Sequence, residues 1–182
     1  MRVIAGEAKG LSLKAVKGLR PTSERVRAAV FSALASLPTD WSRVLDLYAG
    51  TGAMGIEALS RGADWADFVE QNPRFCAIIK ENLSRTGFGE RAKVYCLEVK
   101  KALSILKQKY SLIFLDPPYD DPSLPSILNA LTLSELVGPE TIIVAEHSPR
   151  LGLESLYGGF ELIKDLRHGD AAVSIFCFGG EN

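Results

Sequence analysis

The chain has 182 residues, a length typical of one domain, and 47% of them are apolar, which is enough to fill a core. Charged residues make up 24%, close to the globular average, so a disordered or fibrous chain is excluded. The net charge of −1 by itself argues against a nucleic-acid partner. That total hides an uneven distribution, because residues 1–27 carry +5 and the rest of the chain carries −6.

The sequence lacks the features of secreted, membrane and metal-binding proteins. It begins without the apolar stretch of a signal peptide and has no run of about 18 apolar residues, so we expect a cytoplasmic protein outside the membrane. Cys76, Cys96 and Cys177 are too far apart in sequence for a C-x-x-C motif, and we expect buried free thiols. His147 and His168 are isolated as well, so no metal site is expected.

The basic segment of residues 1–20 predicts a short N-terminal β-hairpin extension. Residues 2–5 and 11–17 are typical of two short strands around a turn that contains Gly6 and Gly10. The alternation in the second strand suits a hairpin that is half-buried.

A helix is expected directly after this extension. Thr22 or Ser23 can cap it, and its apolar spacing continues to about Leu37. Arg25 and Arg27 lie in or near its first turn, where positive charge opposes the helix dipole. A bound phosphate would relieve that repulsion, and a solvated helix face is the alternative.

Residues 21–182 predict an alternating α/β body. Strands are expected at residues 44–48, 67–70, 93–97, 112–115 and 141–146, with helices at 53–61, 73–85, 101–108 and 123–137. This alternation predicts a parallel sheet with helices on both faces. Residues 160–166 and 172–178 favour two more strands joined by a short turn, hence an antiparallel C-terminal hairpin. Ligands of such sheets bind beyond the carboxyl ends of the strands.

A glycine-rich loop follows the first expected strand of the body. Gly50, Gly52 and Gly55 match G-x-G-x-x-G, and Glu70 follows at the end of the next strand, where its carboxylate can hold a ribose diol. The pattern suits a dinucleotide, whose pyrophosphate binds helix-start amides, and equally S-adenosylmethionine, whose ammonium needs an acceptor such as Asp46. Asp46 can instead cap the loop through backbone amides. The loop alone therefore leaves the cofactor open.

The fourth expected strand ends in Asp116-Pro117-Pro118-Tyr119. The prolines fix the backbone and remove two N–H donors, so the carbonyl of Pro117 can point into the site. This carbonyl and the Asp116 carboxylate can accept both hydrogens of an exocyclic amino group, and Tyr119 offers a face for stacking a base. The set favours methylation of a nucleobase amino nitrogen, which requires alignment rather than a nucleophile or metal. A rigid turn without chemistry is the alternative.

These motifs resemble the RsmD family of bacterial 16S ribosomal RNA guanine-N2 methyltransferases. The resemblance covers nearly the whole chain, at residues 2–6, 9–10, 20–23, 25–27, 44–52, 57–63, 68–70 and 116–119. The glycine loop is specific only to the methyltransferase superfamily, and Asp-Pro-Pro-Tyr narrows the target to an amino nitrogen. The Arg-Pro-Thr-Ser segment at residues 20–23 points to this family.

The resemblance implies one Rossmann-like class I methyltransferase domain with a mixed seven-stranded sheet. It implies transfer of a methyl group from S-adenosylmethionine to N2 of one guanine of 16S ribosomal RNA, within the small subunit or a late precursor. Glu98 stands where the family often has an aspartate that meets the adenine amino group. We expect a monomer without a metal.

Three groups of site residues follow from the motifs and the resemblance. Cofactor contacts are expected from Asp46, Tyr48, Gly50, Gly52, Glu70, Gln71, Glu98 and Val99. The catalytic set is Asp116, Pro117 and Tyr119. RNA contacts are expected from Arg2, Lys9, Arg20, Thr22, Arg25 and Arg27, with the target base flipped into a concave site.

Three other functions stay open from the sequence. A methyltransferase for adenine N6 would more usually carry Asn-Pro-Pro-Tyr and an added recognition domain. An NAD-dependent oxidoreductase has no obvious use for Asp-Pro-Pro-Tyr. An RNA-binding assembly factor without activity would not need Asp46, Glu70 and Asp116.

Overall fold

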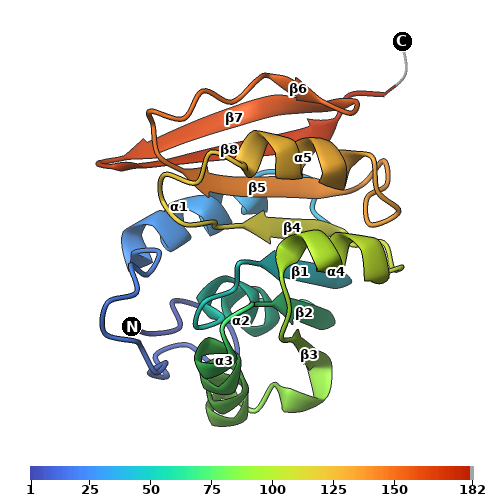
Figure 1. Ribbon diagram of the computed structural model, residues 1–182. Helices are drawn as coiled ribbons and strands as arrows, with labels where there is room; N and C mark the ends of the chain where they lie inside the picture. Colours follow the sequence, from blue (N-terminus) through green and yellow to red (C-terminus); the bar gives the residue numbers. More distant parts are fainter. Residues whose placement is uncertain (181–182) are drawn as a thin grey trace.

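The computed structural model describes residues 1–180. The strands are β1 (Arg43–Leu47), β2 (Trp65–Val69), β3 (Ala92–Tyr95), β4 (Leu112–Leu115), β5 (Ile142–His147), β6 (Leu156–Tyr157), β7 (Phe160–His168) and β8 (Ala171–Phe178). The helices are α1 (Glu24–Ala35), α2 (Ala53–Ser60), α3 (Pro73–Thr86), α4 (Val99–Ile105) and α5 (Leu124–Thr132), with a 3-10 turn, η1, at Gly89–Arg91. Within these residues the strands form one sheet in the order β3-β2-β1-β4-β5-β8-β7-β6 (Figure 1).

The sheet is mixed, as expected, but it has eight strands instead of seven. Strands β1 to β5 pair in parallel, and β8 joins β5 in the antiparallel direction. The hairpin of β7 and β8 completes the expected C-terminal arrangement. The additional strand, β6, has two residues and pairs with the start of β7, so it is too short to leave a periodic pattern in the sequence.

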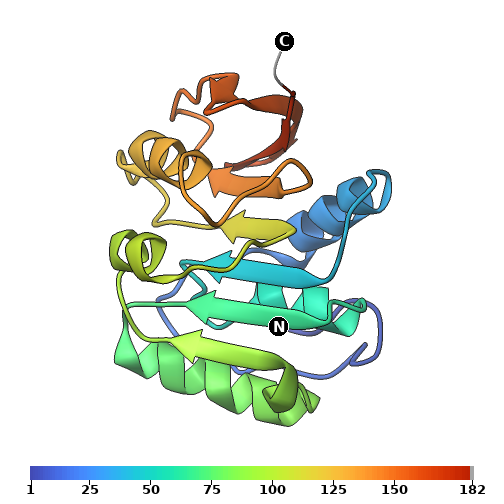
Figure 2. The same ribbon diagram turned by 90° about the vertical axis from the view of Figure 1, so that its right-hand side faces the viewer.

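Helices cover both faces of the sheet, and the strand side chains alternate between them (Figure 2). Val44 and Phe114 belong to the core that includes residues of α1, α2 and α3. Leu45 and Ile113 belong to the opposite core, with residues of α4 and α5. Both faces of the central strands are therefore buried, which explains the continuous apolar run of β4.

Two helices differ from their expected bounds. Helix α4 begins and ends earlier than residues 101–108, because Val99 already lies in its first turn. Helix α5 ends at Thr132, well before residue 137. The hydroxyls of Thr132 and Ser134 donate to backbone carbonyls of the preceding turn, and such bonds compete with continuation of the helix.

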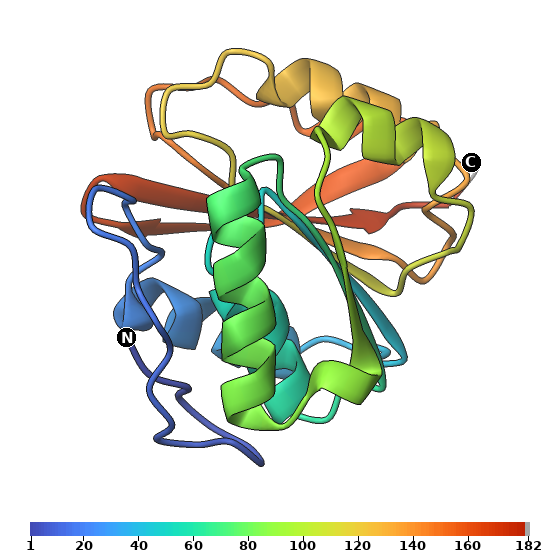
Figure 3. The ribbon, with the colours of Figure 1, turned by 60° about the horizontal axis from the view of Figure 1, so that its bottom comes forward.

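The N-terminal extension forms only a short part of the expected hairpin. Arg2 and Ser12 form an antiparallel bridge, and the backbone N–H groups of Val3 and Leu13 donate to the carbonyl oxygens of Leu11 and Met1. Residues 1–20 contain no strand longer than this bridge, and the segment runs largely as loops beside α1 and α3 (Figure 3). The pairing stays short because other backbone groups of the extension bond to side chains of the body.

Glu57 and Ser60 of α2 hold this extension. The backbone N–H groups of Ile4 and Ala5 donate to the two carboxylate oxygens of Glu57, at 2.9 and 3.1 Å. Gly6 has a φ of +83°, and a Cβ at this position would lie 1.8 Å from the carbonyl oxygen of Ser60. Only glycine therefore permits this approach of the extension to the end of α2.

Arg27 points into the same contact and not toward solvent. Its side chain is 0% exposed, its Nη1 lies 3.4 Å from Glu57 Oε2, and its Nη2 donates to the carbonyl oxygen of Arg2 at 2.9 Å. The expected phosphate contact of Arg27 is therefore wrong. Its charge instead joins α1, α2 and the N-terminal extension.

This buried ion pair leads to a stability prediction. We expect Glu57→Ala to lower the free energy of unfolding by about 3–5 kcal/mol, because it leaves Arg27 buried without a counter-ion. Urea denaturation followed by circular dichroism measures the change. In the control, Glu135→Ala removes the exposed pair with Lys107 (3.5 Å) and should leave the midpoint nearly unchanged. Equal losses in both variants would contradict this role of Glu57.

Candidate active site

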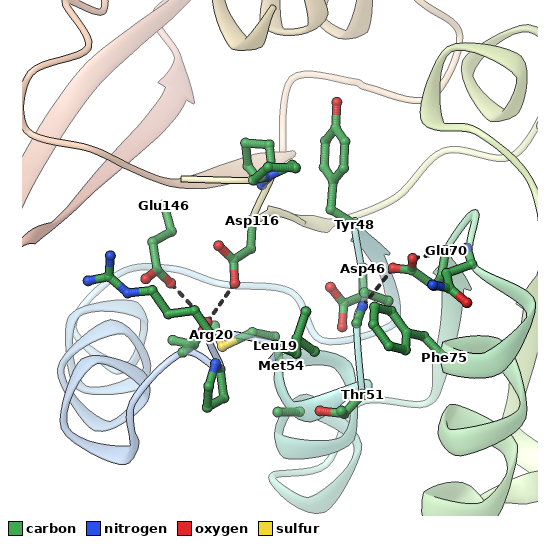
Figure 4. Close-up of a pocket in the computed structure, with 18 of the residues that line it drawn as sticks. Leu19, Arg20, Asp46, Tyr48, Thr51, Met54, Glu70, Phe75, Asp116 and Glu146 are labelled. Atoms are coloured by element: carbon green, nitrogen blue, oxygen red, sulfur yellow. Dashed lines mark hydrogen bonds between the residues drawn. The ribbon is translucent and has the colours of Figure 1, made fainter. Parts of the chain in front are cut away.

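A cavity of about 430 Å³ lies beyond the carboxyl ends of β1, β2, β4 and β5, the edge at which the sequence places the ligand. Its size is that of a small-molecule site. Asp46 and Glu70 lie at one end of it, and Asp116 and Glu146 at the other (Figure 4). The remaining lining residues are Leu19, Arg20, Pro21, Thr22, Tyr48, Ala49, Gly50, Thr51, Ala53, Met54, Val69, Gln71, Asn72, Phe75, Val99, Pro117, Pro118, Tyr119 and His147.

The glycine loop between β1 and α2 is braced by the two carboxylates expected to bind the cofactor. The N–H of Gly50 donates to Glu70 Oε2, and the N–H of Gly55 donates to Asp46 Oδ2, both at 2.9 Å. A Cβ on Gly55 would lie 2.4 Å from the Phe68 ring, so glycine allows α2 to pack closely on β2. The third glycine of the motif thus serves helix–strand packing.

Asp46 still has a free acceptor after bracing the loop. Its side chain is buried, with 1% exposed, and its Oδ1 has no hydrogen-bond partner within residues 1–180. Burial raises the pKa of Asp46 well above its ordinary value, the Gly55 N–H lowers it, and the charges of Asp116 and Glu70 raise it further. A buried carboxylate with one free oxygen fits a cationic group such as an ammonium. The loop-capping and ligand-binding interpretations of Asp46 are therefore compatible.

Tyr48 introduces strain into the same loop. Its φ of +57° is the only positive value at a non-glycine position in the part of the chain described. Such strain in a cavity wall is typical of functional sites. The ring is half-buried, and burial raises the pKa of Tyr48 to about 12.

Of the cofactor-binding residues expected beyond Glu70, one does not line the cavity. Gln71 and Val99 line the cavity, whereas Glu98 is exposed and is not among the lining residues. The structure therefore does not bring Glu98 to the cavity. Phe75, which the sequence analysis missed, lines it from the first turn of α3 beside Glu70 (Figure 4). An aromatic residue just after an Asn-Pro helix start was the available signal.

The other end of the cavity contains a second carboxylate pair. Thr22 Oγ1 lies 2.7 Å from Asp116 Oδ2 and 3.0 Å from Glu146 Oε2. Burial and the charge of Glu146 raise the pKa of Asp116 to about 7, and burial also raises the pKa of Glu146. Thr22 is 8% exposed and lines the cavity, so the structure places it at the two carboxylates and not on the outer surface with Arg25. Glu146 was missed altogether.

The expected base-stacking face is covered in this structure. The guanidinium of Arg20 lies 4.4 Å from the centroid of the Tyr119 ring, a cation–π contact. Leu19 approaches the glycine loop, since its Cδ2 lies 3.3 Å from the place of a Cβ on Gly50. Residues 19–22 therefore form one wall of the cavity. Pro117 is buried and also lines the cavity.

The other residues expected to contact RNA lie on the surface. Arg2, Lys9 and Arg25 are exposed. Arg2 lies 3.9 Å from Glu24, whereas Lys9 and Arg25 have no ion-pair partner within residues 1–180.

The cysteines are free, but they do not all match the expected burial. Cys76 is buried, Cys177 is half-buried and Cys96 is exposed. The sulfur atoms of Cys76 and Cys96 lie 2.6 Å apart, a proximity that their distance in sequence concealed. Over residues 1–180 there is no cluster of three or more histidine, cysteine or acidic side chains arranged for a metal, and no helix there could cross a bilayer.

The fold and the site together define a class I, Rossmann-like methyltransferase. The sheet order, the glycine loop after β1, the acid after β2 and Asp-Pro-Pro-Tyr after β4 are all present. The family described as Conserved hypothetical protein 95, the RsmD family, matches residues 1–177, and the chain belongs to it.

Similar proteins agree with this assignment. The chain is 35% identical to YlbH of Bacillus subtilis over 181 residues, which cover 97% of this chain and 98% of YlbH. It is 31% identical to ribosomal RNA small subunit methyltransferase D of Escherichia coli K12, over 97% of this chain and 89% of that protein. The solved structure of a hypothetical protein from Thermus thermophilus has a TM-score of 0.82 at 33% identity, covering 96% of this chain and 98% of that one.

Proposed function

We propose that this protein methylates the exocyclic N2 of a guanine in 16S ribosomal RNA, within the small subunit or a late precursor, with S-adenosylmethionine as methyl donor. The family and the small-subunit relative support methylation of ribosomal RNA. The observation that carries the proposal is one cavity that has an acceptor for a cation at one end, Asp46, and an acceptor set for an amino group, Asp116 and Pro117, at the other.

The charge of the cavity favours this cofactor over a dinucleotide. Four carboxylates line it, from Asp46, Glu70, Asp116 and Glu146, against the single arginine Arg20. A pyrophosphate would be repelled by these carboxylates, whereas the ammonium and sulfonium of S-adenosylmethionine are attracted. This difference argues against the NAD-dependent alternative.

Each cofactor-binding residue has a distinct role in this proposal. Asp46 Oδ1 accepts the ammonium, and Glu70 accepts the ribose hydroxyls in addition to the loop amides. Gly50 and Gly52 allow close approach of the backbone. S-adenosylmethionine supplies an electrophilic methyl group on its sulfonium. The adenosine end is bounded by Gln71, Phe75 and Val99. Glu98, which was expected to contact the adenine, is not in the cavity wall.

At the other end, the chain orients the target amine. Asp116 and the carbonyl of Pro117 accept its two hydrogens, which fixes the nitrogen for in-line attack. Tyr119 stacks the base once Arg20 leaves the ring face, and Arg20 is then free to contact a phosphate. No metal is required for this chemistry, and we expect a monomeric, cytoplasmic enzyme.

A labelled-methyl assay on small subunits that lack the modification tests the proposed function. We expect one methyl group per subunit, identified by nucleoside analysis as N2-methylguanosine. Asp116→Ala should lower the rate at least 100-fold and leave S-adenosylmethionine affinity within about threefold, because Asp116 contacts the target amine.

The matched control is Asp64→Ala, which removes an exposed aspartate outside the cavity and should retain wild-type activity. Wild-type activity of Asp116→Ala would contradict the assigned role. A methyl group found on adenine N6 would overturn the guanine assignment, and tighter binding of NAD than of S-adenosylmethionine would overturn the cofactor assignment.

The RNA contacts make a separate prediction. We expect Lys9→Ala combined with Arg25→Ala to weaken binding to small subunits and to reduce the slope of log affinity against log salt by about 2, since each phosphate contact contributes roughly 1. Filter binding across a salt series measures the slope. Lys100→Ala combined with Lys101→Ala, on the exposed side of α4, is the control and should not change it. An unchanged slope in the first variant would refute these contacts.

A further inference from the structure

The hydroxyl of Thr22 lies between the carboxylates of Asp116, which the proposed function uses to hold the target amine, and of Glu146, which has no role in it so far. Its oxygen is 2.7 Å from Asp116 Oδ2 and 3.0 Å from Glu146 Oε2. A hydroxyl has one hydrogen, so it can donate to only one of these oxygens. Both contacts are hydrogen bonds only if one carboxyl group donates its own proton to Thr22. The three side chains therefore form a continuous path along which protons can move.

The fold fixes this path from three separate elements. Phe114 of β4 is paired with Val144 of β5, so Asp116 and Glu146 lie one step further along the same face of adjacent parallel strands. Thr22 comes from the third element, since it directly precedes the N-cap of α1. Because neighbouring strands and a helix start hold the groups, their contact does not depend on a flexible loop tip.

The charged and titratable neighbours of this pair are few. Arg20 faces it from residues 19–22 and lowers both pKa values, and Asp46 faces it from β1. His147 also lines the cavity, but its Nδ1 bonds the carbonyl of Ser148 at 2.9 Å and its Nε2 lies 2.8 Å from the Ser174 hydroxyl. With both ring nitrogens occupied, His147 is not part of the path.

We propose that Thr22 and Glu146 form a proton relay behind Asp116, which removes the proton that the target amino group loses during methylation. Glu146 is the terminal acceptor, and Thr22 is the positioning residue that connects it to Asp116. The inference rests on the proposed function only in requiring an amino nitrogen as the target. Guanine N2 and adenine N6 lose a proton in the same way.

The step balances without a further reactant. The nitrogen lone pair forms the new N–CH₃ bond, and the S–CH₃ bond breaks with its electron pair staying on sulfur. The nitrogen then carries one proton too many, which Asp116 accepts. Thr22 takes a proton from Asp116 and passes its own to Glu146, which returns it to water.

The electrostatics of the pair match this task. Burial and mutual repulsion raise the pKa of Asp116 to about 7, near the working pH, where a general base is most effective. Arrival of a cationic methyl donor favours the ionised carboxylates, so the pair is ready to accept a proton when the donor is bound.

Four variants test the relay by single-turnover methyl transfer to small subunits across a pH series. We expect Glu146→Gln and Thr22→Val to lower the plateau rate about 100-fold with S-adenosylmethionine affinity unchanged. Thr22→Ser, which keeps the hydroxyl, should recover to within about threefold of wild type. Glu140→Gln, an exposed glutamate before β5, should behave as wild type. The relay is overturned if Thr22→Val keeps the wild-type plateau, or if Thr22→Ser loses as much as Thr22→Val.

Carbon-13 NMR titration of the carboxyl groups in the ligand-free protein gives a readout independent of activity. Glu146→Gln should lower the pKa of Asp116, because a like charge is removed, and Thr22→Val should raise it, because a stabilising hydrogen bond is lost. An Asp116 pKa that moves in neither variant would overturn the coupling. If the wild-type enzyme makes a product other than N2-methylguanosine, only the guanine assignment is refuted. The relay is tested separately, by the variants and the NMR titration.

Discussion

The crowding of four carboxylates at one edge of the sheet is the constraint on which the rest of the site depends. Parallel strands end at the same edge, so Asp46, Glu70, Asp116 and Glu146 converge there as a consequence of topology. Burial and mutual repulsion raise the pKa of Asp46 and of Asp116, so the ionised forms of these carboxyl groups are electrostatically unfavourable. A cationic ligand would relieve that cost, and the proposed preference for S-adenosylmethionine over a dinucleotide rests on this charge.

The basic N-terminal part of the chain is held to the body by an ion pair and contacts this acidic edge through a hydrogen bond. Arg27 and Glu57 fasten α1 and the extension to α2, and the start of α1 places Thr22 against Asp116. Arg25, in the first turn of α1, is exposed. The exposed charge of Arg25 and the buried hydroxyl of Thr22 therefore lie close together at the start of α1.

Sequence patterns predicted those segments whose conformation depends mainly on their own residues. The apolar run of β4 and the Asp-Pro-Pro-Tyr segment that follows it were readable because a strand buried on both faces and a pair of prolines have few alternatives. Arg27 was misplaced although it shares a helix face with Val30 and Phe31, since its partner Glu57 lies 30 residues away. The helical spacing placed Arg27 on the buried face, but burial of its charge depends on Glu57, which the sequence did not show to be nearby.

The errors at the site have a similar origin. Glu146 stood at the end of a correctly predicted strand, but its place beside Asp116 depends on the register of β4 and β5, which the sequence does not display. Thr22 was expected to contact RNA, and its contact with Asp116 and Glu146 was not predicted because those partners are more than 90 residues away in the sequence. The expected N-terminal hairpin is reduced to a single bridge, because several of its backbone groups bond to side chains of α2, which no periodicity in residues 1–20 reveals.

The most direct test of the charge-based account is the number of protons exchanged when ligands bind at pH 7. Calorimetric titrations in buffers of different ionisation enthalpy measure it. Because a bound cation lowers carboxyl pKa values that burial has raised, S-adenosylmethionine should release protons on binding. S-adenosylhomocysteine lacks the sulfonium charge and should release fewer. Proton uptake, or equal release with both ligands, would contradict the account.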